Sequence, residues 1–121
     1  MRMLICGGRD FNGAHLVYLA LDAAHGRRPI SLLIHGAAPG ADTLAGAWAA
    51  SRGVPALSVP ALWHAQGAKA GPLRNQAMLE GVYGLVPEGV IAFPGARGTA
   101  DMVKRATAAG LQVWQPKPKP N

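Results

Sequence analysis

The stretch that decides the fold reads Val90-Ile91-Ala92-Phe93-Pro94-Gly95-Ala96-Arg97-Gly98-Thr99-Ala100-Asp101. Its apolar start is typical of a buried strand, which Pro94-Gly95 brings to an end. Beyond Gly98, apolar residues recur at helical spacing as far as Gly110, at Met102, Val103, Ala106 and Ala109. The glycines therefore lie in a tight turn from strand to helix, whose free backbone N–H groups are expected to hold a phosphate-sized anion. The spacing matches neither the dinucleotide fingerprint nor the Walker loop.

Short apolar runs and helical patterns alternate along the rest of the chain. Further strands are expected over residues 3–6, 31–35, 56–59 and 111–114. Helices are expected from Asn12 to Gly26, from Asp42 or Thr43 to Gly53, and from Pro72 onward, after a loop over 60–71. Five strands alternating with four helical patterns predict an α/β fold, a Rossmann-like, doubly wound parallel sheet with helices on both faces. The strand order expected for it is 3-2-1-4-5.

Length and composition fit one folded domain. We expect it to span residues 1–115 of the 121, followed by a disordered proline and lysine tail over 116–121. No apolar run is long enough to cross a bilayer and the start lacks a signal peptide, so a cytoplasmic protein without membrane contact is expected. The single cysteine excludes an internal disulfide, and no Cys/His cluster has the spacing of a zinc site. Neither a metal nor a cofactor is expected.

The formal net charge of +6 is compatible with nucleic acid or with small anionic ligands. The basic residues are scattered, however, with no run longer than Arg27-Arg28 or Lys104-Arg105. Aromatic residues, which stack on single strands, are not interleaved with them. The pattern therefore favours a solvated basic surface over a nucleic-acid interface.

The expected topology brings two glycine turns together. Right-handed crossovers put every strand-to-helix turn at the carboxyl edge of the sheet, where the first and fourth strands are neighbours at the switch point. Gly7-Gly8-Arg9-Asp10 then lies beside the turn from Pro94 to Thr99. Arg9 and Arg97 are expected to face the crevice and pair with a phosphate. This convergence favours ligand binding over the alternative that these glycines only tolerate a positive φ.

Charged residues at the same edge have structural alternatives. Arg74 is expected in the first turn of its helix, where a cation opposes the dipole and so hints at a use in binding. Asp10, Asp42 and Asp101 are candidates for holding sugar hydroxyls or activating water. Asp42 and Asp101 would also be stabilised simply by a helix N-terminus, and an aspartate in a turn, such as Asp10, is common.

The uncharged candidates at this edge also have both a structural and a ligand-binding interpretation. Thr99 is a helix cap or a phosphate ligand, and Trp63 stacks on a base or covers the core. Cys6 is expected to be a small core side chain. His35 and His64 have no partner at a catalytic spacing and are expected to be structural.

Five segments carry a resemblance to a known family: Gly7-Gly8-Arg9-Asp10-Phe11, residues 35–42, Trp63, residues 70–78, and residues 93–101. The chain resembles the SLOG superfamily, nucleotide-binding domains similar to the cytokinin-activating "lonely guy" enzymes and to DNA-processing protein A. Within it, the sequence is most similar to the small bacterial and phage YspA-like branch, a family of unknown function. The resemblance covers nearly everything from Met3 to Trp114.

The resemblance implies a Rossmann-like domain that binds a nucleotide or a nucleotide-derived ligand, such as a nucleoside phosphate or an ADP-ribose-like molecule, as a sensor or binding module. By analogy with the enzymes, it also implies a homodimer. The residues expected to bind the ligand are Gly7, Gly8, Arg9, Gly36, Trp63, Arg74, Asn75, Pro94, Gly95, Arg97, Gly98 and Thr99.

The lonely guy enzymes release a base from nucleoside 5′-monophosphates and share the pattern Pro-Gly-Gly-x-Gly-Thr-x-x-Glu, with Arg-Lys-x-x-Met upstream. Here the second glycine is Ala96, the lysine is Asn75 and the glutamate is Met102. Cleavage of an N-glycosidic bond needs a carboxylate, and Asp101 lies about 100° away around the helix. An N-glycosidase is therefore the first alternative, and single-stranded nucleic-acid binding the second. The catalytic candidates are Asp10, Asp42 and Asp101.

Overall fold

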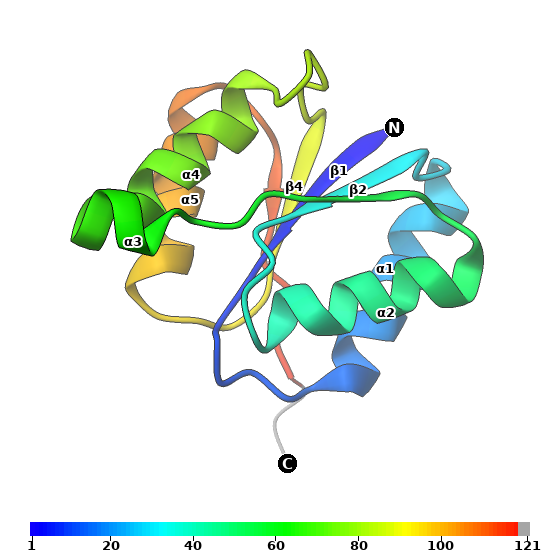
Figure 1. Ribbon diagram of the computed structural model, residues 1–121. Coiled ribbons are helices and arrows are strands. Elements are labelled where there is room, and N and C mark those ends of the chain that lie inside the picture. The colour runs from blue at the N-terminus through cyan, green and yellow to red at the C-terminus, as the bar shows by residue number, and fades with distance from the viewer. Residues whose placement is uncertain (119–121) are drawn as a thin grey trace.

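The computed structural model describes residues 1–118, so residues 119–121 of the expected tail lie outside the described part (Figure 1). One sheet of five parallel strands has the order β3-β2-β1-β4-β5. The strands are β1 (Arg2–Cys6), β2 (Leu32–His35), β3 (Ala56–Ser58), β4 (Gly89–Ala92) and β5 (Val113–Trp114). The α/β fold and the strand order predicted from the sequence are confirmed.

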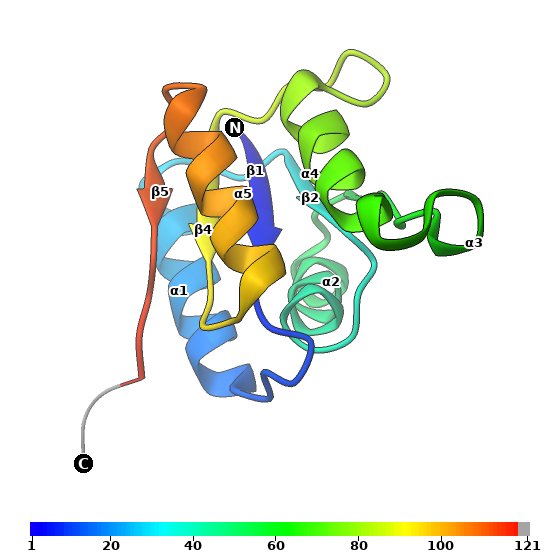
Figure 2. The same cartoon turned by 90° about the vertical axis from the view of Figure 1, so that its left-hand side faces the viewer.

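Helices cover both faces of this sheet, as Figures 1 and 2 show. One face carries α1 (Ala14–Arg27) and α2 (Ala41–Arg52), and the other carries α4 (Ala70–Glu80) and α5 (Arg97–Ala108). Side chains of β1 alternate between the two layers, so that Ile5 packs with α1 and α2 while Leu4 packs with α4 and α5. Both side chains are fully buried, which fixes the register of the central strand.

The segment between β3 and α4 differs from the expected open loop. It contains α3 (Trp63–Gln66) and a 3-10 helix, η1 (Gly67–Lys69), which runs directly into α4. α4 consequently begins at Ala70, and Pro72 is its third residue rather than its first. A proline is accepted there because the first N–H groups of a helix have no intrahelical partner. No residue of α3 or η1 is buried, so the sequence has no apolar periodicity that would predict these helices.

The helices α2 and α5 start at the carboxyl edge without side-chain caps. α2 begins at Ala41, whose N–H donates to the Gly8 carbonyl oxygen at 3.1 Å. α5 begins at Arg97, with Ala96 as its cap, and neither helix has a capping hydrogen bond from a side chain. Thr99 is therefore the third residue of α5 and not its cap. α1 likewise starts after Gly13 and not after Asn12.

Within the expected tail, Pro116 is buried whereas Lys117 and Pro118 are exposed. No helix in residues 1–118 combines the length and the hydropathy needed to cross a membrane.

Candidate functional site

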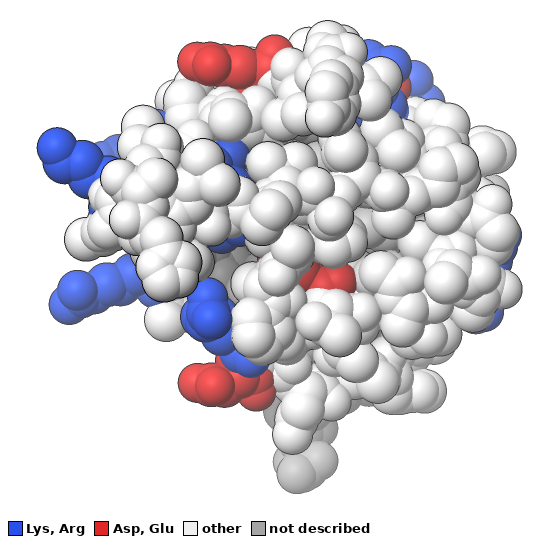
Figure 3. All heavy atoms as spheres, in the orientation of Figure 1, with Lys and Arg blue, Asp and Glu red and all other residues white. Residues whose placement is uncertain are grey.

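A cleft of about 1030 Å³ opens at the carboxyl edge of the sheet, where the turns after β1, β2 and β4 meet α3 and α4. Figure 3 shows separate Lys and Arg side chains at the left-hand side of the molecule, above and below the uncharged surface of α3. All fifteen predicted site residues line this cleft: Asp10, Asp42, Asp101, Gly7, Gly8, Arg9, Gly36, Trp63, Arg74, Asn75, Pro94, Gly95, Arg97, Gly98 and Thr99. Their shared position is thus established, while their roles depend on the contacts described below.

The cleft also has lining residues that the sequence did not single out. These are mostly apolar or small and include Ile5, Cys6, Phe11, Ala38, Ala68, Gly71, Pro72, Met78 and Ala96. Phe11, Ala38, Gly71, Pro72, Met78 and Ala96 fall inside the segments that carry the family resemblance, which was the available signal for them. Ala68 lies in η1 and had no signal of any kind.

The two glycine turns touch, as the topology predicted. The Gly8 N–H donates to the Pro94 carbonyl oxygen at 2.8 Å. A Cβ on Gly8 would lie 2.9 Å from that oxygen, and a Cβ on Gly95 would lie 2.7 Å from the Gly8 nitrogen. Neither residue has a positive φ. Glycine is therefore required at both positions by the close approach of the two backbones and not by backbone conformation.

The N-terminus of α5 opens into the cleft without a partner from the chain. Ala96 supplies no capping side chain, and the first turn contains no acidic residue. The first bonded N–H group belongs to Ala100, which donates to the Ala96 carbonyl oxygen at 3.0 Å. Among the described residues, the N–H groups of residues 97–99 have no hydrogen-bond partner. Such a helix end is a ready anion site, and the exposed side chains of Arg9 and Arg97 line the same cleft.

Arg74 is not in the first turn of α4, as expected, but is its fifth residue, because the helix begins earlier than the sequence indicated. Its Nη1 donates to the carbonyl oxygens of Gly36 and, at 3.3 Å, of Val59. A Cβ on Gly36 would overlap the guanidinium, so glycine is needed there for the arginine to enter. Burial lowers the pKa of Arg74, the charge of Asp42 acts in the opposite direction, and the nearby charge of Arg9 lowers it. Arg74 therefore braces the ends of β2 and β3 and leaves only part of its guanidinium to a ligand.

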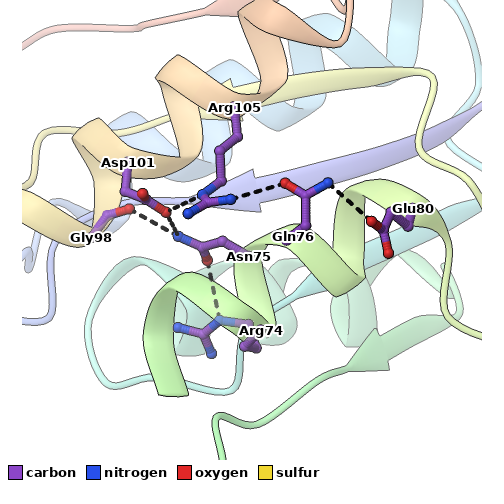
Figure 4. Close-up of polar contacts among 7 residues, drawn as sticks. All are labelled: Arg74, Asn75, Gln76, Glu80, Gly98, Asp101 and Arg105. Carbon is purple, nitrogen blue, oxygen red and sulfur yellow. Dashed lines mark hydrogen bonds and ion pairs between the residues drawn. The ribbon is translucent and has the colours of Figure 1, made fainter. Parts of the chain in front are cut away.

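Asp101 belongs to a polar network that joins α4 to α5 (Figure 4). Its Oδ2 accepts hydrogen bonds from Asn75 Nδ2 at 3.0 Å and from Arg105 Nε at 2.9 Å. Asn75 is buried and also donates to the Gly98 carbonyl oxygen, while its Oδ1 accepts from Arg74 Nε. The network fixes the start of α5 against α4, and it occupies one oxygen of Asp101 with two donors.

Asp42 is the most buried of the three aspartates, with 5% of its surface exposed. Its Oδ2 accepts hydrogen bonds from the backbone N–H groups of Gly36 at 3.0 Å and Ala38 at 3.2 Å. Its Oδ1 is buried and has no hydrogen-bond partner. Burial raises the pKa of Asp42, although these two N–H groups and the charges of His35 and Arg74 act in the opposite direction.

The other candidate side chains divide into exposed and buried ones. Asp10 is exposed, and Trp63 stands at the mouth of the cleft with 49% of its surface exposed. Cys6 is buried as expected, and burial raises the pKa of its thiol to about 12. His35 accepts a hydrogen bond at Nδ1 from the Ala37 N–H at 3.0 Å, and burial lowers its pKa. His64 is exposed on α3.

Met102, which stands where the lonely guy pattern has its glutamate, does not line the cleft. It is fully buried between α5 and the sheet, packed with Leu4, Cys6, Met78 and other apolar side chains. The position therefore faces the core in this chain.

Sequence comparison finds a matching family model and a similar phage protein. The model of the family described as "YspA, cpYpsA-related SLOG family" matches residues 1–65. The Gene 61 protein of Mycobacterium phage D29 is 35% identical over 120 residues, covering 93% of this chain and 93% of that protein. No solved structure matches the chain.

Proposed function

Because the chain belongs to the YspA, cpYpsA-related SLOG family, we propose that it binds a nucleotide or a nucleotide-derived ligand in the cleft at the carboxyl edge of its sheet. Membership of this family is consistent with a nucleotide-related role. The observation that carries the proposal is the uncapped N-terminus of α5, which opens into the cleft.

The ligand phosphate would lie on the N–H groups of residues 97–99. A phosphate gains most at a helix end that no side chain already neutralises, and α5 has neither a capping side chain nor an acid in its first turn. Arg97 on α5 and Arg9 after β1 approach the same place and are exposed, so both are free to close on a phosphate. Gly98 carries no side chain that would keep the phosphate away from the backbone.

The rest of the cleft suits the remainder of a nucleotide. Its volume of about 1030 Å³ is at the upper end of the size range of small-molecule sites, and apolar residues make most of its floor. Trp63 offers an aromatic face at the mouth, where a base can stack. A sensor or binding module needs no more than this arrangement.

The N-glycosidase alternative is supported less well by the same contacts. The glutamate position is the buried Met102, and Oδ2 of Asp101 is held by Asn75 and Arg105. Asp42 and Asp10 remain in the cleft as carboxyl groups that can act on a sugar. Chromatography for free base after incubation with nucleoside monophosphates tests this alternative: release of base supports it, and intact nucleotides together with measurable binding favour a binding module.

Isothermal titration with AMP and ADP-ribose tests the proposal itself, using wild type, Gly98→Ala and Gly26→Ala. Both glycines are helical, and a Cβ at either position meets no atom within 4 Å. Each alanine is therefore expected to leave the fold intact or stabilise it slightly. We expect Gly98→Ala to weaken binding at least about tenfold by blocking phosphate approach, whereas Gly26→Ala binds as the wild type does. Absence of binding by the wild type refutes the proposal for these ligands.

A further inference from the structure

We propose that Asp42 accepts a hydrogen bond from a sugar hydroxyl of the ligand, so that the cleft prefers ribonucleotides to deoxyribonucleotides. The inference rests on the proposed function, because it assigns the sugar to a place within the same cleft.

The first argument is an incomplete set of hydrogen bonds at Asp42. The carboxyl group is 5% exposed, and its Oδ2 already accepts from the N–H groups of Gly36 and Ala38. Its Oδ1 has no partner, and within residues 1–118 no Lys, Arg or His makes an ion pair with it. A buried acceptor without a donor is unfavourable. A hydroxyl that reaches Oδ1 from the cleft, once the side chains that cover this oxygen shift slightly, therefore gains binding energy that water does not already supply.

The second argument is that the other two aspartates of the cleft are less suited. Oδ2 of Asp101 already accepts hydrogen bonds from Asn75 and Arg105, which hold the side chain at the contact between α4 and α5 (Figure 4). Asp10 is exposed, so water competes for its oxygens. Asp42 alone of the three combines burial, a fixed orientation and an unpaired oxygen.

The third argument is the spacing along the sheet edge. Asp42 follows β2 and the open end of α5 follows β4, and these strands flank β1 on opposite sides. β2 and β4 are two strand spacings apart, which is about 10 Å. A sugar with a 5′-phosphate bridges such a gap when the phosphate lies on α5 and the hydroxyls point toward β2.

The fourth argument concerns the kind of donor. Arg74 lies close enough to lower the pKa of Asp42 by its charge, and a second cation such as a metal ion would be repelled by it. A neutral hydroxyl group is not repelled by Arg74. A hydroxyl also donates to an ionised carboxylate and accepts from a protonated one, so it fits Asp42 in either state, which matters because burial raises the pKa of this group.

Titration of the wild type with AMP, 2′-deoxy-AMP and 3′-deoxy-AMP tests the inference. Loss of a hydrogen bond to a buried carboxylate is expected to weaken binding of at least one deoxy ligand about tenfold or more. Equal affinity for all three nucleotides overturns the inference while leaving the proposed function in place. No binding of any of them refutes the proposed function, and this inference with it.

Variants at Asp42 then test the residue. Asp42→Asn keeps an oxygen for the two loop N–H groups, and Asp42→Ala removes the carboxyl altogether; thermal unfolding shows which variants stay folded. We expect the ratio of deoxy-AMP to AMP dissociation constants to fall toward one in each folded variant. Asp101→Asn is the matched control, in which the ratio stays at the wild-type value. A wild-type ratio in Asp42→Asn, or the same fall in Asp101→Asn, overturns the assignment to Asp42.

Discussion

The N-termini of α2 and α5 stand at the same edge of the sheet and differ in charge and in hydrogen bonding. At α2, Asp42 lies in the first turn, Thr43 Oγ1 donates to the Ala38 carbonyl oxygen, and the Ala41 N–H is bonded to Gly8. At α5, the first turn contains no acid and the first N–H groups have no partner among the described residues. α2 thus begins with one bonded N–H group and an acid in its first turn, although the N–H groups of residues 42 and 43 have no partner among the described residues; α5 begins with neither.

The turn that leads into α2 should tolerate substitution less well than the start of α5. Gly40 precedes α2 with a φ of +79°, and an added Cβ would meet the carbonyl oxygens of Gly8 and Arg9. We expect Gly40→Ala to lower the free energy of unfolding by more than about 3 kcal/mol, measured by urea denaturation.

Gly53→Ala is its control, since Gly53 also has a positive φ but its Cβ would meet no atom within 4 Å. It should lose only about 1 kcal/mol. Equal losses in the two variants would show that backbone conformation alone, and not the packing of the turns, makes the entrance of α2 rigid.

The contact between α5 and α4 gives the next largest effect. Asp101→Ala removes the acceptor shared by Arg105 Nε and the buried Asn75 Nδ2. As donors, these residues keep only their bonds to Gln76 and to the Gly98 carbonyl oxygen, so we expect a loss of about 1–2 kcal/mol. A double-mutant cycle with Arg105→Ala measures the pair itself, with an expected coupling of about 0.5 kcal/mol. A coupling of zero would mean that Asn75 alone holds Asp101 and thereby the start of α5.

Placing an acid at the start of α5, as at the start of α2, tests the difference between the two helix ends most directly. Ala96→Asp places an acceptor and a negative charge at the open end, so we expect it to raise the free energy of unfolding by about 1 kcal/mol. The same charge should weaken nucleotide binding at least about tenfold by repelling the phosphate. Ala96→Ser, which caps without charge, should stabilise similarly and weaken binding less. A more stable Ala96→Asp protein with unchanged affinity would contradict an anion site at α5.

The smallest effect concerns His35, the last residue of β2, which precedes the turn that leads to Asp42. Burial lowers its pKa, so as the pH falls below 6.5 the unfolded chain takes up a proton before the folded one does. The wild type should therefore lose stability over this range, because protonated His35 cannot accept the Ala37 N–H. His35→Gln, compared with wild type by thermal unfolding at each pH, should lose less; parallel curves would exclude His35 as the titrating group.

Apolar periodicity and turn residues were enough to predict the sheet, its order and the shared cleft. β1 after Arg2 and the whole of β4 are short apolar runs, and Gly8 and Gly95 mark the turns that meet. The segment 63–69 was missed because all of its residues are exposed, so that burial leaves no pattern in the sequence. The early start of α4 follows from this omission, and with it the position of Arg74 within the helix.

The different contacts of Asp42 and Asp101 could not be predicted from the sequence for another reason. Asp101 and Asp42 look alike as acids near helix starts, and only the fold brings Asn75 to one of them and buries an oxygen of the other. Such partners come from distant parts of the chain, and single-residue patterns carry no record of them. Whether these residues bind a ligand stays a prediction.

The burial of Met102 bears on how this scaffold could change over evolutionary time. A glutamate there would place a charge among the buried apolar side chains beneath the helix and not in the cleft. A protein engineer seeking hydrolysis would do better to begin from the solvent-facing rim, at Asp10, where a carboxylate already stands in water. The interior of this helix therefore limits which chemistries its descendants can acquire.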